Sequence, residues 1–179
     1  RDWKPFSVTF FMTGDEKQLV AHGLNDDLCF SETCVADFQR WIRSEYRSLS
    51  KLNREWGTSF KSWEEVYPID LDTAKKTGQI ARWIDHRRHM EYLWAKLQSD
   101  AKAWIREFIP WAEVGTSGSH DPGHTPTLTP ALGGIDYWRL YRITQLDMNY
   151  YYPLQLDAAR DFTSESALIG MGLFGGYQQ

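Results

Sequence analysis

The sequence has few cysteines, no long apolar run and no basic stretch. The two cysteines, Cys29 and Cys34, are too few for a disulfide framework or a four-thiolate zinc site, and they do not identify a compartment. No apolar run approaches the length of a membrane span, so we expect a soluble chain with no membrane contact. The net charge of −4, without a basic stripe, argues against a nucleic acid partner.

The composition is that of a globular protein. At 179 residues, 42% of them hydrophobic and 25% charged, the chain fits a single domain spanning residues 1–179. Aromatic residues make up 15% of the sequence, and this excess suits either carbohydrate binding or a large core. The chain begins at Arg1 with neither an initiator methionine nor a signal-peptide pattern, so we expect a processed, excised or incomplete chain.

The first apolar stretch predicts a strand that ends in two carboxylates. Residues 8–12 are β-branched or aromatic, as in a strand buried on both faces, and Thr13-Gly14 breaks the run. Asp15 and Glu16 follow immediately. In a parallel α/β barrel the carboxyl ends of the strands carry the chemistry, and partial burial there suits a general acid. The alternative is a solvated acidic turn.

Helical patterns dominate the middle of the chain. Ser31 is a good N-cap for a helix that continues to about residue 46, and a second helix over 49–56 is closed by Gly57. Apolar residues then recur at helical spacing from 80 to 108, which predicts a long helix.

The helical patterns also predict whether individual side chains lie in the core or at the surface. His86, Arg87 and Arg88 interrupt the apolar stripe on its polar side or at one end of it. We interpret His86 and His89, whose spacing on a helix is poor for metal binding, as surface residues. The tryptophans on the helical stripes are expected in the core rather than as sugar platforms: Trp41, Trp83, Trp94 and Trp104.

Strands and helices alternate after residue 110. Apolar segments predict three further strands and a helix, over residues 112–116, 145–149, 167–174 and 135–143 respectively. Such alternation indicates right-handed βαβ units and a parallel sheet. Four strands are half of an eight-stranded barrel, so the predicted fold is a partial (β/α)8 TIM barrel in the α/β class.

One segment carries a recognisable motif. Its residues are Tyr46, Leu49, Leu52, Asn53, Trp56-Gly57-Thr58, Phe60 and Trp63. The segment resembles family 42 glycoside hydrolases, which are retaining β-galactosidases with a (β/α)8 barrel. The resemblance implies that this chain covers roughly strands four to seven, with an extended helical insertion after the first of them. It also implies that Glu16 is the general acid/base and that the substrate is a β-linked glycan.

The sequence departs from the family in three respects. Asp15 stands where the family has an Asn that contacts the sugar's 2-hydroxyl. Cys29 and Cys34 lack the other ligands of the zinc cluster found in some members, so we predict no zinc and no other cofactor. The nucleophilic Glu expected after the seventh strand is missing from residues 175–179. We therefore expect an incomplete catalytic domain, inactive alone, that needs the remainder of the barrel or a partner chain.

Further site residues remain open between two interpretations. The resemblance places a nucleophile-binding Tyr at Tyr150 or Tyr151, although core packing or sugar stacking would explain either residue equally well. His120 lies in a Gly/Pro-rich loop and could line the cleft or be merely solvated. The alternative function for the whole chain is a non-catalytic carbohydrate-binding or scaffold module derived from a glycosidase barrel.

Overall fold

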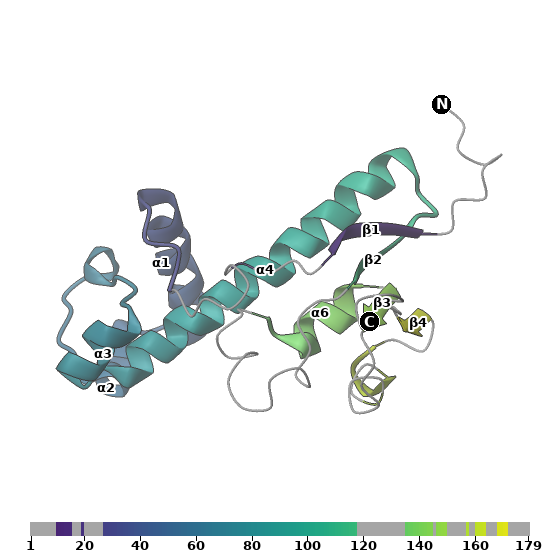
Figure 1. Cartoon of the computed structure of the whole chain (residues 1–179). Coiled ribbons are helices and arrows are strands. Elements are labelled where there is room, and N and C mark those ends of the chain that lie inside the picture. Colours follow the sequence, from purple (N-terminus) through teal and green to yellow (C-terminus); the bar gives the residue numbers. More distant parts are fainter. Residues whose placement is uncertain are drawn as a thin grey trace.

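A single long helix organises the molecule. The computed structural model describes residues 10–15, 19, 27–117, 135–144, 146–149, 157, 160–163 and 168–171. Helix α4 (Ile80–Phe108) crosses the whole view in Figure 1, with three helices around its first half and a sheet beside its second half. The predicted helix over residues 80–108 is confirmed.

The helical half is built from α1 (Glu32–Tyr46), α2 (Leu49–Trp56), the 3-10 turn η2 (Trp63–Glu65) and α3 (Leu71–Thr77). The predicted N-cap is confirmed, since the Ser31 hydroxyl accepts a hydrogen bond from the Cys34 amide at 3.3 Å. The predicted C-terminal glycine is also confirmed: Gly57 ends α2 in the left-handed conformation, with φ 67°. Helix α3 was not predicted.

These helices enclose an aromatic core. Its buried members are Phe38, Trp41, Ile42, Leu52, Trp56 and Val66. Asn53 fixes the turn that follows α2: its side-chain oxygen accepts hydrogen bonds from the Thr58 hydroxyl at 2.8 Å and the Phe60 amide at 3.0 Å, and its amide donates to Phe60 O at 2.9 Å. The Leu-Asn-x-x-Trp-Gly-Thr motif is therefore a structural unit that closes this core.

The other half holds four parallel strands in the order in which they occur along the chain. They are β1 (Phe10–Asp15), β2 (Glu113–Ser117), β3 (Leu146–Asn149) and β4 (Leu168–Met171). Helix α6 (Tyr137–Ile143) connects β2 to β3 and packs against α4. The predicted parallel sheet is confirmed.

Strand β1 differs from its prediction in two ways. It does not end at Met12 but continues through Thr13-Gly14 to Asp15, and its pairing with β2 is irregular between Met12 and Asp15. It is also not buried on both faces. Phe11 packs towards the core, whereas Phe10 and Met12 are 39% and 40% exposed, because no described residue covers that face.

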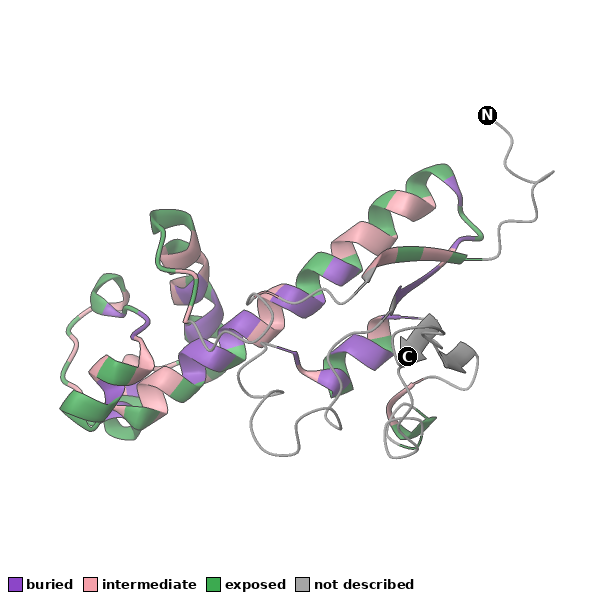
Figure 2. Cartoon of the chain, viewed as in Figure 1, coloured by how far each residue is buried: buried purple, intermediate pink, exposed green. Residues whose placement is uncertain are grey.

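The interior of α4 also differs from its prediction. Figure 2 shows that the buried residues of this helix gather in its middle, where α1 and α6 contact it. His86 and His89 are fully buried, so their assignment to the surface was wrong. Trp104, expected in the core, is 58% exposed. The polar run in the middle of the helix faces inward because acidic and carbonyl oxygens from other elements meet it there.

Candidate functional site

The carboxyl ends of the four strands lie along one edge of the sheet. Asp15 of β1 is in register with Ser117 of β2, Ser117 with Met148 of β3, and Asn149 of β3 with Met171 of β4. Parallel strands place their following loops at this edge, and in α/β folds that edge holds the chemistry. The sequence prediction that Asp15 lies at the mouth of a parallel strand agrees with this register.

The remaining predicted site residues lie outside the described part of the chain. Glu16 follows Asp15 directly in the sequence, Tyr150 and Tyr151 follow the last residue of β3, and His120 comes three residues after the end of β2. The structure thus describes the ends of the strands that precede these residues, but not the residues themselves.

A polar contact anchors the irregular end of β1. The Thr13 hydroxyl lies 2.5 Å from Gln98 Oε1 on α4 and 3.1 Å from the Gly115 carbonyl on β2. Gln98 is only 5% exposed, so this contact is shielded from water and is stronger than it would be at the surface. The strand that presents Asp15 is therefore tied to both of its neighbours immediately before the predicted site.

A buried carboxylate secures the segment that precedes α1. Asp27 lies 3.1 Å from the Arg87 guanidinium, and both side chains are about 5% exposed (5% and 6%). The Trp83 indole N–H donates to the same carboxylate at 2.9 Å, and the Leu71 amide donates at 2.7 Å. Asp27 thus joins the segment leading out of the β1 loop to α3 and α4.

His86 lies between two carbonyl groups. Its Nδ1 is 3.0 Å from Ile69 O, and its Nε2 is 2.7 Å from Leu28 O. A neutral imidazole donates from one nitrogen only, whereas the protonated ring would donate to both carbonyls. Burial lowers the pKa of His86, and the two carbonyls act in the opposite direction.

Two further carboxylates meet the same stretch of α4. Asp85 accepts hydrogen bonds from the Tyr46 hydroxyl at 2.6 Å and the Trp56 indole at 2.8 Å, and it pairs with an arginine one turn along the helix. His89 Nε2 lies 3.0 Å from Asp37 Oδ2. Burial lowers the pKa of His89, while the hydrogen bonds to Asp37 hold the pKa of that carboxyl below its usual range despite partial burial.

This buried polar cluster is structural rather than catalytic. Each of its carboxylates is committed to donors from other elements, so the cluster joins α4 to the helices and segments around it. Sequence reasoning missed it because the partners on other elements are 17 to 60 residues away in the sequence. The available signal was the run of five ionisable residues from Asp85 to His89 inside an apolar helix.

Within the described residues, no three His, Cys, Asp or Glu side chains are arranged to hold a metal ion.

Burial raises the pKa of the Cys29 thiol to about 12, with Cys34 and Asp37 adding to the effect. Burial therefore disfavours the thiolate form of this cysteine in the folded protein. No helix in the described ranges combines the length and hydropathy that a membrane crossing requires.

Comparison with known proteins decides the family. The sequence model of glycoside hydrolase family 42, described as beta-galactosidase, matches residues 13–170, which include the whole parallel sheet apart from the start of β1 and the end of β4. The chain belongs to glycoside hydrolase family 42. The resemblance seen in the Trp-Gly-Thr segment is thereby confirmed.

The relatives are much longer than this chain. The β-galactosidase bgaB of Geobacillus kaustophilus is 31% identical in an alignment 101 residues long, which covers 52% of this chain and 15% of that protein. The crystal structure of a cold-adapted β-galactosidase from Rahnella sp. R3 aligns with a TM-score of 0.53 and 17% identity. The alignment covers 70% of this chain and 18% of that one.

An exo-carrageenase of family 42 from Bacteroides ovatus aligns with a TM-score of 0.52 and 22% identity, over 64% of this chain and 15% of that one. At such identities these two structures show the fold alone, which is that of family 42 TIM-barrel enzymes. The small parallel sheet and its helices share this TIM-barrel architecture.

Proposed function

We propose that this chain is a segment of the catalytic domain of a retaining glycoside hydrolase acting on β-galactosides, with Glu16 as its general acid/base. The observation that carries the proposal is the position of Asp15. It ends a strand paired in parallel with β2, at the edge where barrel enzymes hold their chemistry, and Glu16 is the next residue. Membership of family 42 supports the same reaction class.

In the proposed reaction, Glu16 protonates the glycosidic oxygen as the leaving sugar departs. It then removes a proton from the water that hydrolyses the glycosyl-enzyme intermediate. The nucleophile is a second carboxylate about 5–5.5 Å away, supplied by the complete protein outside residues 1–179. Asp15 accepts a hydrogen bond from the substrate, and Tyr150, Tyr151 and His120 contribute to the surrounding subsite.

We further propose that β1 to β4 are strands four to seven of the barrel, and that the rest of the barrel covers the surfaces left open here. Within the described sheet β1 is an edge strand, and it exposes Phe10 and Met12. Trp104 and Phe108 of α4 are 58% and 83% exposed. An unpaired strand edge beside exposed aromatic side chains is what a barrel segment presents where neighbouring strands and helices join it.

The test is Glu16→Gln in the complete protein. Removing a general acid lowers turnover by about 10²–10⁴-fold, and the loss depends on how much the leaving group needs protonation. We expect a loss in this range on lactose, whose leaving group is a sugar alcohol. A much smaller loss is expected for the glycosylation step of a dinitrophenyl β-galactoside, because its leaving group departs without a proton.

Glu113→Gln is the matched control. Glu113 starts β2 at the opposite, amino-terminal edge of the sheet, so it should retain full turnover on both substrates. Equal losses of kcat/KM, which reports the glycosylation step, for Glu16→Gln on both substrates would contradict the acid role. Unchanged turnover would reject Glu16 altogether and favour a non-catalytic carbohydrate-binding or scaffold module.

A further inference from the structure

A surface groove follows α4 between α1 and α6. It consists of two adjoining hollows of about 290 Å³ and 330 Å³ that share Tyr92 and Arg139. Small-molecule sites occupy roughly 300–1,000 Å³, so each hollow is at the lower limit and together they form an elongated site. The lining residues come from helices, whereas the proposed catalytic edge is formed by strands.

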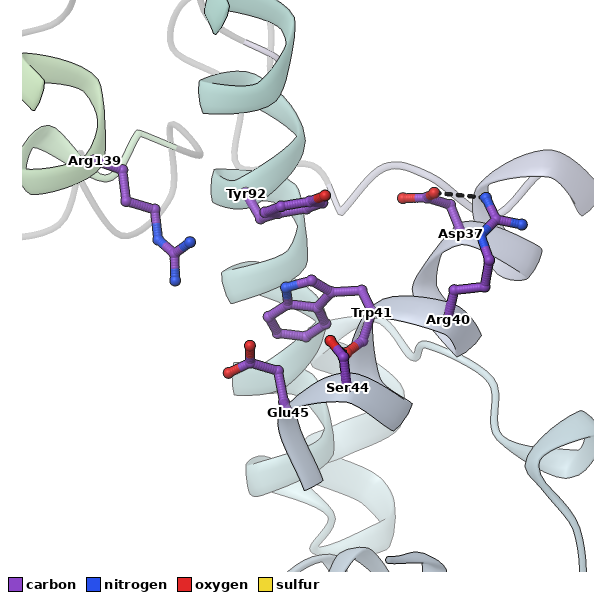
Figure 3. A pocket seen from close by; sticks show the side chains of 7 residues that line it. All are labelled: Asp37, Arg40, Trp41, Ser44, Glu45, Tyr92 and Arg139. Atoms are coloured by element: carbon purple, nitrogen blue, oxygen red, sulfur yellow. Dashed lines mark hydrogen bonds and ion pairs between the residues drawn. The ribbon is translucent and has the colours of Figure 1, made fainter. Parts of the chain in front are cut away.

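Hydrogen-bonding groups of opposite kinds face each other across the first hollow. Figure 3 shows the Arg139 guanidinium and the Glu45 carboxylate both directed into this space from opposite sides. Glu45 pairs with Arg88 at 3.3 Å, and Arg139 uses only Nε, which donates to Asp136 at 3.0 Å. Among the described residues none accepts from the terminal nitrogens of Arg139, so these donors are available to a ligand.

An aromatic ring stands where the two hollows meet. Tyr92 is half-buried, and it stacks on His89 with the ring centroids 6.1 Å apart and the planes inclined by 25°. The Trp41 ring also contacts Tyr92, with the two ring centroids 6.2 Å apart. These contacts fix the orientation of the Tyr92 ring, while its hydroxyl has no hydrogen-bond partner in the described part of the chain. A fixed ring with a free polar tip suits a ligand that has both an apolar face and hydroxyl groups.

The charges of the groove are balanced within the protein. Arg40 pairs with Asp37 at 2.7 Å, and Lys96 pairs with Asp100. With Glu45 and Arg139 also partnered, no charge remains to attract an anion or a cation strongly. A neutral ligand rich in hydroxyl groups therefore fits this lining better than a phosphate, a sulfated sugar or a metal ion.

We propose that this groove binds an uncharged oligosaccharide, with one sugar packed on Tyr92 and its hydroxyls shared between Arg139 and Glu45. Planar guanidinium and carboxylate groups each contact two neighbouring hydroxyls, as a sugar ring presents them. The groove is a second carbohydrate site, distinct from the hydrolytic one. It goes beyond the proposed hydrolysis and stands independently of it.

The test is affinity electrophoresis of the complete protein in native gels containing dissolved, neutral β-1,4-galactan. The unaltered protein should be retarded as galactan increases. In Tyr92→Ala and Arg139→Met the apparent dissociation constant should rise at least tenfold, while turnover of nitrophenyl β-galactoside stays within twofold. Tyr67→Ala and Arg54→Met are matched exposed controls that should leave retardation unchanged.

Several results would overturn the proposal. If Arg139→Met is retarded as strongly as the unaltered protein, the proposal is wrong. This variant is the safer test, because Arg139 is exposed and its substitution does not threaten folding, whereas the loss of the Tyr92 ring could. Stronger retardation by sulfated carrageenan than by neutral galactan would reject the ligand class. No retardation of the unaltered protein would reject the site. By contrast, if Glu16→Gln loses turnover but is still retarded by galactan, the result supports a carbohydrate site separate from the hydrolytic one.

Discussion

The buried ion pair between Asp27 and Arg87 provides a sharp test of the structural account. Asp27 accepts from Arg87 at 3.1 Å, from Trp83 at 2.9 Å and from the Leu71 amide at 2.7 Å, and it is almost completely shielded from water. Asp27→Asn keeps the shape but removes the charge that the guanidinium faces. Breaking a buried ion pair costs about 3–5 kcal/mol, whereas breaking an exposed pair costs about 0–1 kcal/mol.

The assay is urea unfolding followed by tryptophan emission, with Asp100→Asn as the control. Asp100 pairs with Lys96 at the surface, where both side chains are well exposed, so its substitution should change stability by less than about 1 kcal/mol. The double variant Asp27→Leu/Arg87→Met should lose less than the sum of its single variants, because no unpaired charge is left buried. A cost below about 1 kcal/mol for Asp27→Asn, or additive losses, would refute the reasoning.

Two further predictions concern the helical half. Asn53→Ala removes three hydrogen bonds that close the turn after α2, so we expect a loss of about 2–4 kcal/mol in the same assay, and a loss under about 1 kcal/mol would contradict the structural role of the motif. Acidification should also destabilise the protein. Burial lowers the folded-state pKa of His86 and His89 below the unfolded value near 6.5, so their contribution is complete above that pH and is lost as the pH falls towards the folded pKa. For each histidine, the free energy of unfolding should fall by at most about 1.4 kcal/mol per pH unit. The measurement is the free energy of unfolding at a series of pH values from 7.5 to 5. A free energy of unfolding that stays constant or rises on acidification would contradict the prediction.

Local patterns predicted the local elements well. The apolar spacing of α4, the Ser31 cap and the Gly57 stop each depend on neighbouring residues, and the structure has all three. The parallel sheet followed from the alternation of strands and helices. Helix α3 was not predicted because it is short and polar, although Asp70 caps its start and Gly78 ends it. Those two residues were the available signal.

Long-range partners decided what local patterns could not. The hydropathy of His86 and His89 placed them at the surface, but Leu28, Ile69 and Asp37 supply the oxygens that make their burial tolerable. The exposure of Phe10 likewise depends on which neighbours a strand has, which its own sequence does not specify. For the candidate site, the sequence predicted a carboxylate at the mouth of a parallel strand, and the structure describes that strand up to Asp15.

The central claim is that Glu16 delivers a proton to the departing sugar, and the pH dependence of kcat/KM on lactose tests it most directly. A general acid must be protonated in the free enzyme, so kcat/KM should fall at high pH as this group ionises. We expect the complete protein to show this basic limb and Glu16→Gln to lose it, keeping only the acidic limb of the nucleophile. A basic limb that persists unchanged in Glu16→Gln would contradict the claim.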